Sequence, residues 1–148
     1  MLIALALAPG LRAQGSAMLS VAPPEKVVAK RNAAAPSRLT VMLAPGYHVN
    51  SNTPSEDYLI PLRLTWTKGA LEAAEILYPK PVMEKYSFSP KPISVFTGKF
   101  EVTTKFKVAA GAPPGPGVMN GKLRYQACND KACFPPKTVD VRLSYVIE

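Results

Sequence analysis

The sequence predicts an all-β protein, an immunoglobulin-like antiparallel β-sandwich. Five segments alternate apolar and polar residues with a period of two, which is typical of half-buried strands. The chain also has 16 prolines among its 148 residues, which is about twice the usual share. Proline is tolerated at strand ends far better than inside helices. Six or seven short strands separated by turns favour a sandwich.

The predicted elements follow one another along the chain. Residues 18–37 are weakly patterned and indicate a loose lead-in or an edge strand. Residues 70–77 contain good helix formers, yet we expect a strand there, because pairing within a sandwich overrides a weak helical preference. Residues 111–117 (GAPPGPG) are predicted to form a rigid loop. The five alternating segments are residues 39–43, 60–67, 100–108, 122–127 and 138–147.

Length and composition are those of one globular domain. Hydrophobic residues make up 47% of the chain and charged residues 19%, close to globular averages, which argues against wholesale disorder. The formal net charge is +8. The basic residues form no run and do not interleave with aromatic residues, so we expect a well-solvated basic surface and no nucleic-acid partner.

Residues 1–17 resemble an incomplete secretion signal. Residues 2–8 form an apolar run that is followed by small residues up to Ala17. No basic residue precedes this run, and an ordinary apolar first strand is the alternative interpretation. The run is too short to span a bilayer. We therefore expect an exported, periplasmic domain over residues 18–148 without stable membrane insertion, where a disulfide can persist.

Cys128 and Cys133 are the only two cysteines, and they lie between two alternating segments in the run YQACNDKACFPP. An antiparallel hairpin would bring them within the distance that a disulfide requires. A bond that closes so short a loop removes little entropy from the unfolded chain. The position is therefore poor for stability and good for exposure. A structural staple and a redox-active dithiol both remain open.

The run YQACNDKACFPP and the strand after it resemble the cysteine hairpin of the N-terminal domain of the periplasmic thiol:disulfide interchange protein DsbD. Residues 46–54 (GYHVNSNTP) and 95–99 (VFTGK) are similar to two further segments of that family. The resemblance runs from about Leu39 to Ile147. It implies an immunoglobulin-like fold and an electron relay of the protein-disulfide reductase type. Its partners would be thioredoxin-like periplasmic proteins, which would form mixed disulfides with it.

The resemblance also implies roles for single residues. Cys133 would be the attacking and attacked sulfur, Cys128 would resolve the mixed disulfide, and Phe96 would be a cap that shields the disulfide until a partner docks. The sequence departs from the family where Ser94 and Val95 replace acidic residues before the cap. Four further residues are expected beside the cysteines: Tyr47, His48, Asn50 and Phe134.

Other kinds of site have weaker support. A lone histidine after a turn, such as His48, is most often a surface or packing residue. A copper site from the two cysteines, His48 and one of Met42, Met83 or Met119 would have soft ligands but no supporting spacing, so we expect no metal and no cofactor. No CxxC motif opens a helix, so we expect the partner to drive the chemistry, either by its thiolate attacking this disulfide or by its disulfide accepting the electrons of the dithiol. The alternative function is a non-catalytic immunoglobulin-like binding module with a structural disulfide.

Overall fold

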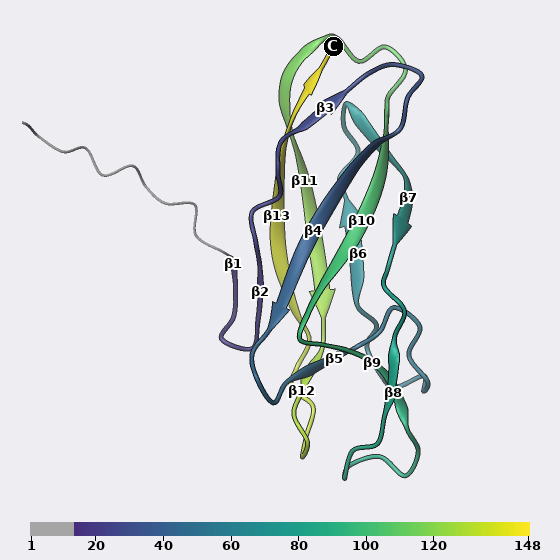
Figure 1. The fold of residues 1–148 in the computed structure, drawn as a ribbon, viewed down its shortest axis with the longest axis vertical. Helices are drawn as coiled ribbons and strands as arrows, with labels where there is room; N and C mark the ends of the chain where they lie inside the picture. The colour runs from purple at the N-terminus through teal and green to yellow at the C-terminus, as the bar shows by residue number, and fades with distance from the viewer. Residues whose placement is uncertain (1–13) are drawn as a thin grey trace, which may run out of the picture.

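The computed structural model describes residues 14–148, which form thirteen strands and no helix. The strands belong to three sheets (Figure 1). The first has the order β1 (Gln14–Gly15), β2 (Leu19–Val21), β4 (Ala35–Leu43), β10 (Lys99–Val108) and β7 (Leu71–Leu77). The second has the order β3 (Val27–Ala29), β13 (Lys137–Ile147), β11 (Gly115–Tyr125) and β6 (Arg63–Trp66). The third has the order β12 (Ala127–Cys128), β5 (His48–Asn50), β9 (Ile93–Thr97) and β8 (Val82–Glu84).

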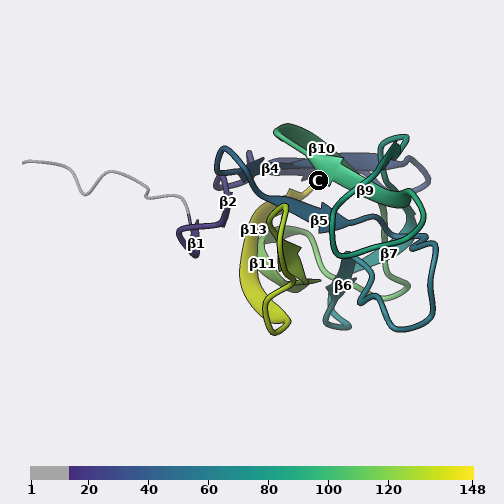
Figure 2. The same ribbon diagram turned by 90° about the horizontal axis from the view of Figure 1, so that it is seen from below.

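The first two sheets pack face to face and enclose the main core (Figure 2). Buried and exposed residues alternate along β4, β11 and β13, as the period-two patterns predict. All strand pairs are antiparallel except β3 with β13. The predicted immunoglobulin-like sandwich is confirmed. The apolar side chains between the sheets include Leu39, Val41, Val102, Leu123, Tyr125, Val139 and Val141.

Most predicted elements match the structure. Residues 70–77 do form a strand, β7, at the edge of the first sheet, where pairing with β10 outweighs their helical preference. The predicted loop over residues 111–117 is shorter than expected, because β11 already begins at Gly115. Pro116 is compatible with this strand because β11 has a partner on only one side there.

The third sheet lies at one end of the sandwich, the lower end in Figure 1. Its strands are short, and residues of β5 and β9 are buried on both faces. Gly98 separates β9 from β10 and has a φ of 65°. Because glycine adopts this left-handed conformation without steric cost, the chain can pass directly from the third sheet into the first.

The expected secretion signal falls mainly on residues 1–13, which lie outside the described part of the chain. Residues 14–17 are described. They form β1 and the turn into β2, and Ser16 Oγ lies 2.9 Å from the Tyr125 hydroxyl oxygen. Within residues 14–148, no helix is long and apolar enough to cross a bilayer.

Candidate functional site

The two cysteines form a disulfide beyond the end of the β11–β13 hairpin. The antiparallel register of these strands ends at the pair Tyr125 and Lys137. Cys128 and Cys133 then face each other with an S–S distance of 2.06 Å and a Cα–Cα distance of 4.0 Å. Cys128 is 0% exposed, whereas Cys133 is partly exposed. The two cysteine residues therefore differ in their exposure to solvent.

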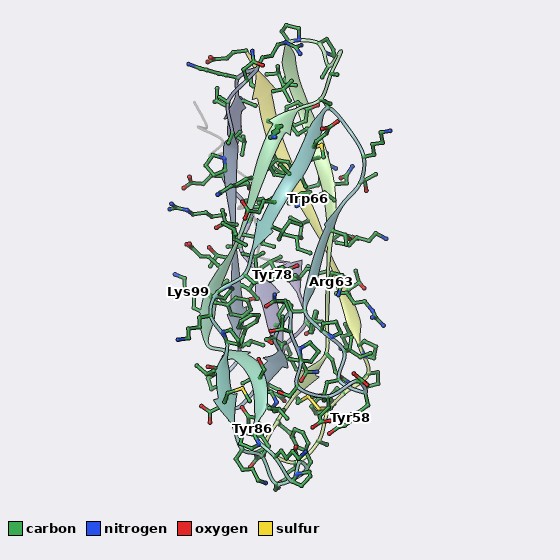
Figure 3. The ribbon with its side chains drawn as sticks, turned by 90° about the vertical axis from the view of Figure 1, so that its right-hand side faces the viewer. Tyr58, Arg63, Trp66, Tyr78, Tyr86 and Lys99 are labelled. Carbon is green, nitrogen blue, oxygen red and sulfur yellow. A yellow bond between two sulfur atoms is a disulfide. The ribbon has the colours of Figure 1, made fainter. Side chains whose placement is uncertain are left out.

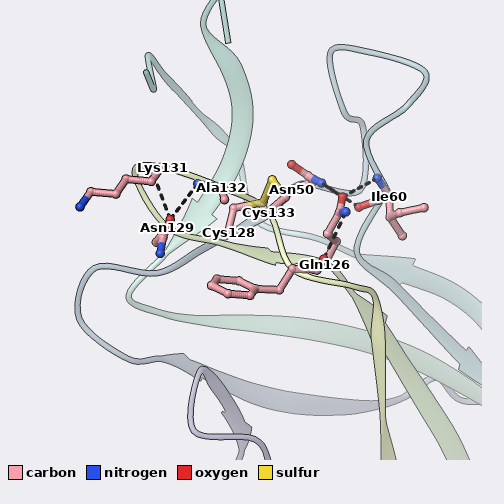
Figure 4. The surroundings of a disulfide bond; sticks show 9 residues. Asn50, Ile60, Gln126, Cys128, Asn129, Lys131, Ala132 and Cys133 are labelled. Atoms are coloured by element: carbon pink, nitrogen blue, oxygen red, sulfur yellow. Dashed lines mark hydrogen bonds between the residues drawn. A yellow bond between two sulfur atoms is a disulfide. The ribbon is translucent and has the colours of Figure 1, made fainter. Parts of the chain in front are cut away.

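The turn between the cysteines is held by Asn129. Its side-chain oxygen accepts hydrogen bonds from the backbone amides of Lys131 and Ala132, both at 2.9 Å. The backbone amide of Asn129 donates to the Ala132 carbonyl, also at 2.9 Å. Asparagine favours such turns because its short side chain can replace a backbone acceptor. Figure 4 shows this turn on one side of the disulfide.

A second polar network lies on the other side of the disulfide (Figure 4). The Asn50 side-chain amide donates to the Ile60 carbonyl at 3.1 Å and to Gln126 Oε1 at 3.0 Å. Gln126 Oε1 also accepts from the Ile60 amide at 3.1 Å. The Gln126 amide donates to the carbonyl of Phe134, after the second cysteine, at 3.4 Å. These bonds connect the cysteine hairpin to β5 and to the segment before β6.

The strand register decides which side chains share a face with Cys128. Cys128 pairs with His48, while Ala127 and Phe96 both pair with Val49. Successive residues of a strand project to opposite faces of the sheet. His48 therefore projects from the same face as Cys128, and Phe96 projects from the opposite face.

Phe96 accordingly lies in the core. It is 3% exposed, belongs to the main core cluster, and packs against Phe100 with ring centroids 4.9 Å apart. A displaceable cap must lie over the disulfide and be able to leave it. The role of Phe96 as this cap stays a prediction, and in this structure the ring is enclosed on the face of the third sheet opposite to Cys128. The sequence did not indicate this face, because most of β9 is buried on both faces and its burial does not alternate.

His48 is enclosed beside the disulfide. It is 2% exposed, and its ring stacks on Tyr86 with centroids 3.9 Å apart. The Phe88 ring is nearly parallel to both and lies to the side of them, with its centroid 6.2 Å from that of His48 and 5.6 Å from that of Tyr86. Burial lowers the pKa of His48 to about 4, so the ring is neutral at pH 7. Among residues 14–148, His48 Nε2 has no hydrogen-bond partner.

The segment Tyr86–Phe88 covers the face of the third sheet from which Cys128 projects. Tyr86 and Phe88 pack against the small apolar cluster of Leu59, Ile93 and Val95. The Ser87 hydroxyl donates to the carbonyl of Asp130, in the cysteine turn, at 2.6 Å. Figure 3 shows Tyr86 at the end of the molecule that holds the disulfide, far from Trp66. We call this segment the aromatic cover.

A hollow of about 490 Å³ opens beside the aromatic cover, with Tyr47, His48, Tyr86 and Asp130 among its lining residues. Tyr47 is also close to Phe134, with ring centroids 6.2 Å apart. The expected residues Tyr47, His48, Asn50 and Phe134 thus all lie around the hairpin. A larger groove, of about 560 Å³, is lined by residues between Ala22 and Thr40 and by Glu101. It includes none of the site residues.

Sequence reasoning missed several site residues. Gln126 follows the alternation of an exposed position, and nothing in its pattern distinguishes it from a solvated strand residue. Asn129 carried a usable signal, because Asn-Asp between two strands is typical of a turn. Tyr86 and Ser87 lie far from the cysteines in sequence, so only the fold brings them near. Among the residues that the structure describes, no group of three or more His, Cys, Asp or Glu could hold a metal.

Comparisons with known proteins agree with this architecture. The structure is similar to the N-terminal periplasmic domain of ScsB from Proteus mirabilis, with a TM-score of 0.64 and 14% identity over 90% of this chain. The chain spans 50% of the length of that protein. It is also similar to the reduced N-terminal domain of Neisseria meningitidis DsbD, with 17% identity, coverage of 86% of this chain and 85% of that one, and a TM-score of 0.48.

No curated protein sequence matches the chain significantly. The model of the family described as "Thiol:disulfide interchange protein DsbD, N-terminal" matches residues 19–144. This match includes both cysteines, the aromatic cover and most of the strands. The chain therefore belongs to the family of DsbD N-terminal domains.

Proposed function

We propose that this protein is a periplasmic thiol:disulfide interchange domain that relays electrons between thioredoxin-like proteins through Cys128 and Cys133. The observation that carries the proposal is the disulfide beyond the end of a hairpin, with Cys133 partly exposed and Cys128 buried. Membership of the DsbD N-terminal family supports the same chemistry. The cysteine pair would make the domain a protein-disulfide reductase in type, with no cofactor.

The difference in exposure gives the two cysteines separate roles. A partner thiolate attacks Cys133, because Cys133 is the sulfur that can be reached. The bond to Cys128 breaks and Cys128 leaves with the electron pair as a thiolate. In the reverse direction Cys133 attacks a partner disulfide, and Cys128 then resolves the mixed disulfide. This assignment agrees with the one that the family resemblance implies.

The reduction potential tests the proposal. We expect a value of about −270 to −180 mV, within reach of thioredoxin-like proteins, whereas a structural disulfide lies below about −300 mV. A reduction potential below about −300 mV would favour a non-catalytic binding module.

Two matched variants test the roles of the two cysteines. Cys128→Ser should accumulate a mixed disulfide with a thioredoxin-like partner, and Cys133→Ser should not. The opposite result would reverse the assignment.

The aromatic cover supplies the shield that the relay needs. A dithiol that is open to solvent reacts with oxidants and small thiols as well as with its partner. Tyr86 is stacked on His48, and Ser87 is bonded to the cysteine turn, so this segment is in a position to restrict access. We propose that it takes the shielding role that the family resemblance implies for Phe96.

A further inference from the structure

His48 Nε2 is a buried polar atom without a partner in the oxidised protein. The only histidine of the chain is 2% exposed, and Nε2 makes no hydrogen bond to any described residue. A buried polar group without a partner has a free-energy cost, and such groups call for an explanation. A neutral imidazole has one N–H donor and one bare nitrogen that accepts. In the tautomer that carries its proton on Nδ1, Nε2 is the bare nitrogen and lacks a hydrogen-bond donor.

Cys128 is the group directly opposite His48. The two residues form a cross-strand pair between β12 and β5, and the Cβ atoms of such pairs lie about 4.5–5.5 Å apart on the same face. In the disulfide, Cys128 has no hydrogen to donate. After reduction it carries an S–H group, buried at 0% exposure next to the histidine. The missing donor therefore exists in only one of the two redox states.

We infer that the Cys128 thiol of the reduced protein donates a hydrogen bond to His48 Nε2, so that His48 selectively stabilises the dithiol. The inference rests on the proposed function and extends it, since it assigns to a residue outside the cysteine pair a part in setting the reduction potential. The Asn50 side-chain oxygen is a second buried acceptor without a partner. It lies two residues further along β5, beside the disulfide in Figure 4, but it is diagonal to Cys128, whereas His48 is the residue that pairs directly with Cys128.

The electron and proton balance of the step is complete. A thiolate of a partner dithiol attacks Cys133, the Cys128–Cys133 bond breaks, and Cys128 receives the electron pair. The Cys128 thiolate takes up one proton and becomes a thiol. The second thiol of the partner loses its proton and then attacks the mixed disulfide. The partner becomes a disulfide, and Cys133 leaves as a thiolate that is protonated from solvent. His48 stays neutral throughout, and its Nε2 accepts a hydrogen bond from the new S–H group of Cys128.

The surroundings of His48 are suited to a neutral acceptor. Tyr86 is stacked on the ring, and its pKa is raised by burial and by the nearby Glu84, so it is uncharged at pH 7. Tyr47 and Asp130 line the same hollow, and Lys131 lies in the turn between the cysteines. Burial also lowers the pKa of His48 to about 4.

The wild-type protein provides the first test. Because the chain has one histidine, its two ring nitrogens can be identified without ambiguity in a long-range ¹H–¹⁵N spectrum of the labelled full chain. We expect a bare Nε2 in the oxidised protein and an upfield shift of its resonance after reduction with dithiothreitol at pH 7. An Nε2 resonance that is the same in both states, or an Nε2 that carries the proton in both, would overturn the inference.

Two variants provide the second test. His48→Phe keeps a ring for stacking on Tyr86 and removes the acceptor, while His48→Gln places an amide oxygen near the former Nε2. Loss of one hydrogen bond should lower the equilibrium constant for reduction by glutathione about three- to tenfold, or about 15–30 mV. His48→Gln should stay near wild type. Equal shifts in both variants would show that Nε2 is not the acceptor.

Neither test uses a protein partner, so the inference about His48 and the proposed relay function can fail independently of each other. A domain that exchanges with no thioredoxin-like protein could still show the hydrogen bond, and an active relay could lack it. If His48→Phe does not fold, the wild-type spectra decide the question alone.

Discussion

At the scale of single residues, His48 and Phe96 project from opposite faces of the third sheet. Substitution of Phe96 should therefore change the stability of the domain, whereas substitutions in the cover on the His48 face should change access to the cysteines. Phe96→Ala removes a ring from the main core, where Phe96 is 3% exposed. We expect it to lower the free energy of unfolding by about 3–5 kcal/mol, measured by urea denaturation. If Phe96→Ala keeps wild-type stability and accelerates thiol labelling, Phe96 is the cap after all.

Tyr86 and Ser87 should behave differently from Phe96. Tyr86→Ala removes the ring that is stacked on His48, and Ser87→Ala removes the bond to the Asp130 carbonyl. We expect both variants to react faster with a small thiol reagent in the reduced state. Ser87→Ala should lose only about 0.5–1.5 kcal/mol of stability. The control is Ser89→Ala, because the Ser89 hydroxyl donates to the Lys91 carbonyl within the same loop and not to the cysteine turn. Unchanged labelling rates in both would remove the aromatic cover from the proposal.

His48 should make stability depend on pH. Its pKa is about 6.5 in the unfolded chain and about 4 in the folded protein. Below pH 6.5 the unfolded state binds a proton that the folded state does not bind until about pH 4. The unfolding free energy contributed by this group therefore falls as the pH falls from about 6.5 to about 4. His48→Phe should have a flatter profile over this range, and an equal slope in both proteins would contradict the assignment.

At the scale of elements, the passage from β9 to β10 depends on Gly98. Its φ of 65° is in the left-handed region, which costs other residues about 1–2 kcal/mol. A Cβ at this position would meet no atom within 4 Å, so the cost of Gly98→Ala is conformational only. We expect a loss of about 1 kcal/mol in chemical denaturation with no change in reduction potential. A larger loss would indicate that the third sheet is disrupted.

The elements also show what could be predicted from the sequence. Alternation predicted the long strands because one face of each meets the core and the other meets water. The third sheet had no such pattern: β5 and most of β9 are buried on both faces, and β8 is exposed throughout. Period-two analysis therefore could not give the face of Phe96. The cysteine hairpin was predicted correctly because its two arms do alternate, and its contacts with Tyr86 and Ser87 depend on pairings distant in sequence.

At the scale of the whole molecule, the disulfide lies apart from what holds the sandwich together. Two core clusters run between the two large sheets, and neither includes a cysteine. The eleven-residue strands β11 and β13 pair along their whole length before the cysteines are reached. A redox domain with this arrangement can change state at its tip while its scaffold stays fixed.

Reduction should therefore leave the domain folded. The disulfide joins residues only 5 positions apart, and the loop-entropy relation gives about 2 kcal/mol of stabilisation for so short a loop. We expect the reduced protein to keep its far-UV circular dichroism and to lose only about 5 °C in Tm. The variant Cys128→Ser/Cys133→Ser, which can form no disulfide, should unfold near the reduced wild type. If reduction unfolds the chain, the disulfide is a structural staple, and the relay could not operate, because its reduced form must persist long enough to meet a partner.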